Sequence, residues 1–131
     1  MHHQEKEIFA QLLDIAARLR GPQGCLWDKK QTLKSMIPNI LEEAEEVKAA
    51  IEAEDQENLC EELGDLLFDI LMVIQIAREQ DFFDFEQVLS GAREKFIRRH
   101  PHVFGDVSVN TSEEALHVWK EMKRKEKSKQ D

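Results

Sequence analysis

Two amphipathic segments, joined by the short connection EAEDQ, constrain the fold of this chain more than any other feature. Apolar residues recur at spacings of three and four up to Ile51 in the first segment, and again from Leu59 to Ala77 in the second. This spacing is typical of helices with one apolar face, and so short a connection predicts a helical hairpin. Within it, the stretch Leu41–Asp69 holds twelve of the 27 acidic residues and one cation, Lys48. We therefore treat the hairpin as a candidate metal site.

The apolar periodicity of the whole chain predicts an all-α fold of about five helices. The expected helices are Gln4–Arg20, a second from between Ser35 and Pro38 to about Glu54, a third over about Gln56–Gln80, a fourth over about Phe85–Arg99, and a last one from a cap at Thr111 or Ser112 to about Glu126. A length of 131 residues is usual for one domain, so we expect a single domain over residues 1–131, with a frayed tail at about 124–131.

The apolar stripes predict which side chains face the core. They are Ile37, Ile40, Leu41, Ala44, Val47 and Ile51 in the second helix, Val88, Leu89, Ala92 and Phe96 in the fourth, and Ala115, Leu116, Trp119 and Met122 in the last. The third helix differs, because from Leu66 to Ala77 it is apolar nearly all round, and five helices of one small chain can hardly cover so much apolar surface. We therefore predict dimerisation through the third helix.

Charge and cysteine content exclude several classes of protein. The chain has 18 basic and 27 acidic residues, a formal net charge of −9, which argues against a general nucleic-acid binder because phosphate contacts need a basic surface. The N-terminal segment carries charges inside its apolar pattern, so it is neither a signal peptide nor a membrane span. Cys25 and Cys60 have no metal-ligand spacing, and reduced thiols are the simplest interpretation. A cytoplasmic protein is expected.

The segment Gly21–Thr32 has no apolar period and contains Trp27, so we expect an ordered loop packed on the body of the protein. Packing is the commoner fate of a lone tryptophan. The alternative is that Trp27 offers a stacking surface for a base.

Four carboxylates of the hairpin are spaced as two pairs, Glu43-x-x-Glu46 and Glu62-x-x-Asp65. Residues three apart project from one face of a helix, and antiparallel pairing of the helices could bring the two pairs face to face. Beside a core they cannot all stay ionised and unpaired, since desolvation and repulsion each cost on the order of several kcal/mol. Oxygen-only ligation indicates a hard divalent ion, with Mg²⁺ ahead of Mn²⁺. The alternative is a solvated acidic face.

Candidate cations follow on the later helices, at Lys95, Arg98, Arg99 and Lys123. A carboxylate-bound magnesium ion together with Lys and Arg suits a polyphosphate substrate. The alternative is that these residues only complement helix dipoles, as basic residues in a last turn commonly do.

Five stretches of the chain, in order, resemble the MazG family of nucleoside triphosphate pyrophosphohydrolases. They are GCLWDKKQT (Gly24–Thr32), LEEAEEV (Leu41–Val47), EELGDLLFD (Glu61–Asp69), KFIRRHPHVFG (Lys95–Gly105) and WKEMKRKEK (Trp119–Lys127). The resemblance implies an all-α fold, a homodimer or tetramer whose active sites use both subunits, and Mg²⁺-dependent cleavage of a nucleoside triphosphate into monophosphate and pyrophosphate. House-cleaning of the nucleotide pool is the implied role.

The resemblance also implies roles for individual residues. The magnesium ligands would be Glu43, Glu46, Glu62 and Asp65, and the nucleotide would be contacted by Lys95, Arg99, Trp119, Lys123 and Trp27. Two positions depart from the family pattern, because Leu26 stands where Pro is common and Asp69 where Gln is common. Asp69 falls on the same helical arc as the proposed metal ligands.

Glu42, next to the ligands but turned away from the apolar stripe, is our candidate to orient or deprotonate the attacking water. The alternative is a solvated surface residue. Two other functions stay open at this point. One is a non-catalytic helical module that binds a metal or a partner, and the other is a specialised dUTP, dCTP or phosphoribosyl-ATP pyrophosphohydrolase.

Overall fold

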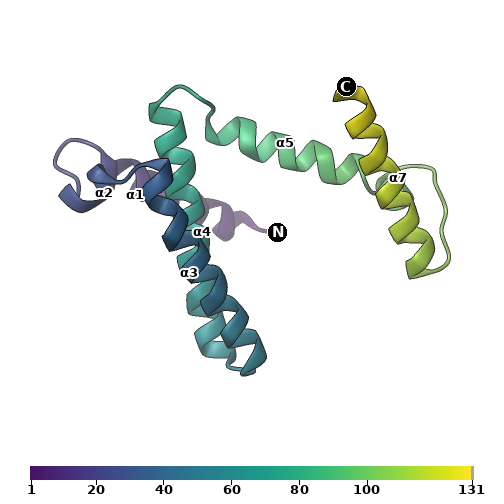
Figure 1. Ribbon diagram of the computed structural model, residues 1–131, viewed down its shortest axis with the longest axis horizontal. Helices are drawn as coiled ribbons and strands as arrows, with labels where there is room; N and C mark the ends of the chain where they lie inside the picture. Colours follow the sequence, from purple (N-terminus) through teal and green to yellow (C-terminus); the bar gives the residue numbers. More distant parts are fainter. Residues whose placement is uncertain (131) are drawn as a thin grey trace. The chain divides into compact units, whose positions relative to one another are not determined.

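The computed structural model describes residues 1–130 and is all-α over that range, which confirms the predicted fold class (Figure 1). Its helices are α1 (His3–Arg20), α2 (Leu26–Lys30), α3 (Leu33–Glu52), α4 (Gln56–Glu79), α5 (Phe85–Arg98), α6 (Pro101–Phe104) and α7 (Ser112–Gln130). The five long helices are the five that periodicity predicts, and the short helices α2 and α6 lie in segments expected to be loops. Among the described residues, no helix is both long and apolar enough to cross a membrane.

The chain divides into two compact units, one from Met1 to Phe85 and the other from Glu86 onward. The expectation of a single domain over residues 1–131 stays a prediction.

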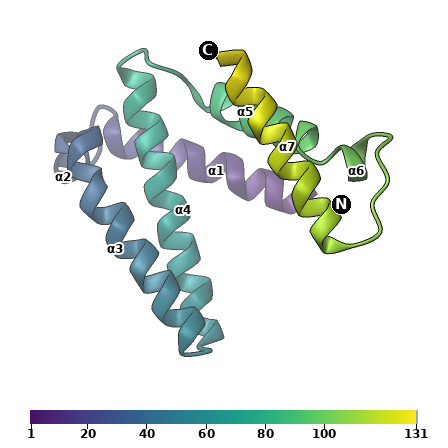
Figure 2. The same ribbon diagram turned by 45° about the vertical axis from the view of Figure 1, so that its right-hand side comes forward.

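In the first unit, α3 and α4 pair along their length as the predicted hairpin, and α1 runs across α4 (Figure 2). Asp55 caps α4, where its side chain accepts a hydrogen bond from the Asn58 backbone N–H at 3.1 Å. The predicted start of the second helix, between Ser35 and Pro38, is wrong. Thr32 and Ser35 form a reciprocal capping box, so that α3 begins at Leu33 and contains Pro38 inside its second turn.

A small apolar core holds the first unit together. It consists of Ala16, Met36, Met72 and Ile76, with Leu19, Leu33, Phe68 and Val73 packed around it. The stripe predicted for the second helix is partly wrong, because Ile37, Leu41 and Ile51 are 53–62% exposed. Helix α3 has a second apolar face, and the face with Met36 and Ala50 is the one that meets α4.

The segment before α3 is ordered by Arg20. Its guanidinium, whose side chain is 9% exposed, pairs with Glu79 at 2.9 Å and also donates to the backbone carbonyls of Asp28 and Gln31. These bonds tie α1, α2 and α4 together, and the Trp27 side chain takes no part in them. The preferred interpretation of that tryptophan as packed is wrong, since it is 70% exposed.

Over its described residues, the second unit, α5 to α7, lacks an apolar core. Between residues 86 and 129, Arg99 is the one buried residue. The predicted inward positions Leu89, Phe96 and Leu116 are about half exposed, at 47–51%, and Trp119 is half-buried. Periodicity predicted amphipathic helices correctly here, but α5 and α7 do not close their apolar faces on one another.

Helix α7 extends to Gln130, so its predicted end at about Glu126 is wrong. The predicted frayed tail therefore belongs to the helix up to that residue, while Asp131 lies outside the described residues. Lys127 and Lys129 favour the extension, because basic side chains in a last turn interact favourably with the helix dipole.

Candidate functional site

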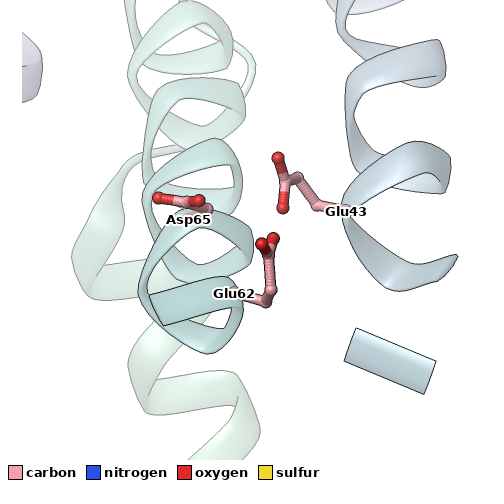
Figure 3. Close-up of side chains that lie close together, drawn as sticks. All are labelled: Glu43, Glu62 and Asp65. Atoms are coloured by element: carbon pink, nitrogen blue, oxygen red, sulfur yellow. The ribbon is translucent and has the colours of Figure 1, made fainter. Parts of the chain in front are cut away.

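Three carboxylates come together across the hairpin. Glu43 on α3 and Glu62 and Asp65 on α4 each offer one oxygen, and these oxygens lie within 4.8 Å of one another. Figure 3 shows Glu43 and Glu62 pointing toward each other from the two helices, with Asp65 beside them. Glu43 and Glu62 are half-buried, and Asp65 is exposed. The cluster is therefore open to solvent on one side.

The electrostatics of the cluster are unfavourable as it stands. The pKa of Glu62 is raised, first by a side-chain hydrogen bond with the Glu43 carboxyl, then by burial, and then by the charges of Glu43 and Asp65. Oε2 of Glu43 is buried and has no hydrogen-bond partner among the described residues. Unpaired buried oxygens are costly, and a cation removes both the cost and the repulsion.

The residues present therefore fit a bound metal ion. Each side chain supplies a carboxylate oxygen, and the orphaned oxygen of Glu43 lies in the group that could hold the ion. A donor set made only of oxygen suits a hard divalent cation rather than a soft transition metal. The fold itself brings the three carboxylates together, whereas the identity of the metal does not follow from the fold.

The other acidic candidates lie outside this triad. Glu46, expected as the fourth ligand, is exposed and does not belong to the group, and Glu42 is also exposed. Asp69, one turn beyond Asp65 on α4, is half-buried. Burial raises its pKa, and the charge of Asp65 raises it further. The roles predicted for Glu42 and Glu46 stay predictions.

A basic hollow of about 440 Å³ lies in the second unit. It is lined by Gly91, Lys95, Arg98, Arg99, Lys123, Glu126 and Lys127. The Arg99 guanidinium lies 5.7 Å from the centre of the Trp119 ring, and the Lys123 ammonium lies 4.9 Å from it. The structure thus brings four of the predicted substrate-binding residues together, and cation–π attraction helps to fix them.

Sequence reasoning missed Glu126, which accepts hydrogen bonds from both Arg98 and Arg99. A signal was present in the chain, because Trp119, Lys123 and Glu126 recur at spacings of four and three and therefore share one face of a helix.

The fold and the triad define a class: an all-α protein whose helical hairpin carries a carboxylate triad that could hold a metal ion. Comparison with known proteins names the family. Residues 31–104 match the MazG nucleotide pyrophosphohydrolase domain. The structure also resembles the crystal structure of a MazG-related protein from Thermotoga maritima, with a TM-score of 0.74 and 34% identity, over 88% of this chain and 98% of that one. The chain belongs to the MazG nucleotide pyrophosphohydrolase domain family.

Several longer curated proteins are similar to this chain over most of its length. A nucleoside triphosphate pyrophosphohydrolase of Escherichia coli strain K12 is 46% identical over 118 residues, which are 89% of this chain and 45% of the relative. The nucleoside triphosphate pyrophosphohydrolase/pyrophosphatase MazG of Thermotoga maritima is 42% identical over 122 residues, 93% of this chain and 46% of the relative. An uncharacterized protein of Bacillus subtilis, YabN, is 42% identical over 92% of this chain and 24% of its own length. The chain thus spans half or less of these relatives.

Proposed function

We propose that this protein hydrolyses nucleoside triphosphates between the α- and β-phosphates, releasing a nucleoside monophosphate and pyrophosphate. The observation that carries the proposal is the triad of Glu43, Glu62 and Asp65 in a chain of the MazG family. The names of its relatives from Escherichia coli and Thermotoga maritima support the same activity. A house-cleaning role in the cytoplasm is part of the proposal.

We assign the metal site to Glu43, Glu62 and Asp65, with Glu46 as a fourth ligand and Mg²⁺ ahead of Mn²⁺ as the ion. When bound, the ion supplies positive charge to phosphate oxygens and makes water more acidic. The hairpin fixes the positions of the carboxylates, because the packing of its two helices holds three like charges together. Glu42 lies at the exposed edge of α3, where its carboxylate can accept a proton from water.

The nucleotide is assigned to side chains with positive charge or an aromatic face. Lys95, Arg99 and Lys123 line the basic hollow, which suits phosphate oxygens, and Trp119 supports two of these cations. Trp27, 70% exposed, has the open ring face that stacking on a base requires.

We further propose a homodimer, with a tetramer as the alternative. The outer face of α3 exposes Ile37, Leu41 and Ile51, and α4 exposes a stripe of apolar side chains at spacings of four and three. This stripe is Leu63, Leu67 and Ile70, at 40–48% exposure. Contiguous apolar surface of this kind marks interfaces. Light scattering at micromolar concentration that gave the mass of one chain would contradict the dimer.

The activity is tested by incubating the protein with Mg²⁺ and a panel of canonical and damaged NTPs and dNTPs, and by identifying the products. Monophosphate plus pyrophosphate supports the proposal, and diphosphate plus phosphate overturns it. Turnover restricted to dUTP, dCTP or phosphoribosyl-ATP would indicate a specialised enzyme. No turnover with any of them would favour a module that binds a metal or a partner.

A further inference from the structure

Glu126 lies among the basic residues that line the hollow of the second unit. Its Oε1 accepts from Arg98 Nε at 2.9 Å and lies 2.8 Å from Arg98 Nη2, and its Oε2 accepts from Arg99 Nη2 at 2.8 Å and from Arg99 Nε at 3.1 Å. The Arg99 side chain is 9% exposed and that of Glu126 is 18% exposed. One carboxylate thus holds two adjacent guanidinium groups in a partly desolvated place.

Glu126 binds one edge of each guanidinium group, and this edge decides which N–H donors stay available for a ligand. A guanidinium carries five N–H donors in one plane. Glu126 takes the Nε and Nη2 edge of both arginines, so the Nη1 donors of Arg98 and Arg99 lie outside the ion pair. Donors held in this way match phosphate oxygens, which arginine binds through two parallel hydrogen bonds.

The charged residues around the ion pair favour an anionic ligand such as a phosphate. Lys95, Lys123 and Lys127 line the same hollow, and Glu126 is its one acidic lining residue among those that the structure describes. Two arginines and three lysines around one carboxylate leave an excess of four positive charges. Such an excess calls for a ligand with several negative charges, which is the property of a di- or triphosphate.

We propose that Glu126 is a positioning residue, which holds Arg98 and Arg99 so that the basic hollow forms a ready-made site for the pyrophosphate part of the substrate. The choice of pyrophosphate as ligand rests on the proposed function. Glu126 acts through the arginines and touches no phosphate itself. The pKa of Glu126, lowered to about 2 chiefly by the Arg99 hydrogen bond, keeps the carboxylate ionised at neutral pH.

The test is calorimetric titration of the protein with inorganic pyrophosphate in metal-free buffer, so that the carboxylate triad takes no part. We expect Glu126→Gln to weaken binding by about tenfold or more, because the arginines lose their alignment. Glu126→Asp, which keeps the charge, should recover part of the loss. The matched control is Glu121→Gln, since Glu121 also pairs with an arginine of α7, Arg124 at 3.0 Å, but does not line the hollow. The control should bind within about twofold of the wild type.

Two results would overturn the inference. Binding by Glu126→Gln as tight as the wild type, or tighter, would show that the carboxylate competes with phosphate instead of positioning the arginines. Wild-type protein that turned over nucleotides but bound no pyrophosphate would leave the proposed function intact and remove the inference. Pyrophosphate binding that depends on Glu126, in a protein without turnover, would support the inference and contradict the proposed function.

A second variant covers the case in which Glu126→Gln does not fold, a real concern because it leaves Arg99 without its carboxylate. The side chain of Arg98 is 49% exposed, so Arg98→Gln should fold, as circular dichroism would verify. We expect about fivefold weaker pyrophosphate binding from the loss of this one cation. Unchanged binding by Arg98→Gln would contradict the site.

Discussion

The two units of this chain are stabilised by opposite means. The unit up to Phe85 has an apolar core around Ile76 and carries 19 acidic against 8 basic residues. The unit from Glu86 onward has 10 basic against 8 acidic residues, and the residue that it buries is a charged one, Arg99. The comparison teaches that the two groups of residues that we propose for the chemistry lie in different parts of the chain. The carboxylates proposed to bind a cation lie on a packed hairpin, and the basic residues proposed to bind an anion include two arginines held by an ion pair.

The division has a physical reason. Like charges at close range repel, so the triad of Glu43, Glu62 and Asp65 needs a scaffold whose stability comes from elsewhere. The apolar contact between α3 and α4 provides that scaffold. Cations can instead be organised by a single carboxylate, because Glu126 attracts both arginines, and no apolar core is needed to hold them.

The largest expected effect concerns the triad. Glu62→Gln keeps the size of the side chain and removes the charge in the middle of the cluster. We expect Mg²⁺-dependent turnover to fall by about a thousandfold or more, while the oligomeric mass and helical content stay unchanged. The neighbouring exposed Glu61, changed to Gln, is the matched control and should keep its activity. Retained activity in Glu62→Gln would contradict the assignment of the metal site.

A second prediction tests whether the units differ in the origin of their stability. Ile76 is fully buried at 0% exposure, so Ile76→Ala should cost about 2–5 kcal/mol in the free energy of unfolding. Leu116 on α7 is 50% exposed, and Leu116→Ala should cost less than about 1 kcal/mol. Denaturant unfolding followed by circular dichroism measures both. Equal losses would mean that the second unit hides an apolar core after all, for instance at a subunit interface.

The sequence predicts the hairpin well, because its determinants are local. Apolar spacing places α1 and α4 almost to the residue, and helical phasing together with antiparallel pairing predicts that Glu43 lies near Glu62 and Asp65. Phasing could not choose between the two apolar faces of α3, since both have the helical period. The face with Met36 is buried because α4 and α1 offer a complementary surface, which is a tertiary property.

The basic cluster was predictable in its members but not in its organisation. The family pattern in the sequence predicts Lys95, Arg99 and Lys123 as phosphate ligands, and in the structure all three line one hollow. Glu126 pairs with two arginines that precede it by 27 and 28 positions and lie outside its helix. Helical periodicity relates only residues of one helix, so it could not predict this pairing. The connection between α5 and α7 sets this pairing, so it could not be read from either helix alone.

A third prediction uses the metal to sharpen the contrast between the units. An ion that binds the folded triad stabilises the protein by about 2.7 kcal/mol when its concentration is 100 times the dissociation constant. We expect Mg²⁺ to raise the unfolding temperature of the wild type in scanning calorimetry, and removal of Mg²⁺ with a chelator to reverse the change. The effect should be absent in Glu62→Gln and preserved in Arg98→Gln, because Arg98 belongs to the other unit. A shift that survived in Glu62→Gln would place the ion elsewhere.

The smallest expected effect is a pH dependence that belongs to the second unit alone. The pKa of Glu126 falls from 4.5 to about 2 in the folded protein, so its ion pair stabilises the fold fully above pH 4.5. That contribution is lost as the pH falls toward about 2, where the carboxyl takes up its proton in both states. The difference in unfolding temperature between the wild type and Glu126→Gln should therefore be constant from about pH 7 to 5 and shrink below that. Glu121→Gln should show a smaller difference, because Glu121 pairs with one exposed arginine and Glu126 with two. A difference between the wild type and Glu126→Gln that did not change with pH would mean that this unit, like the first, is held together by packing.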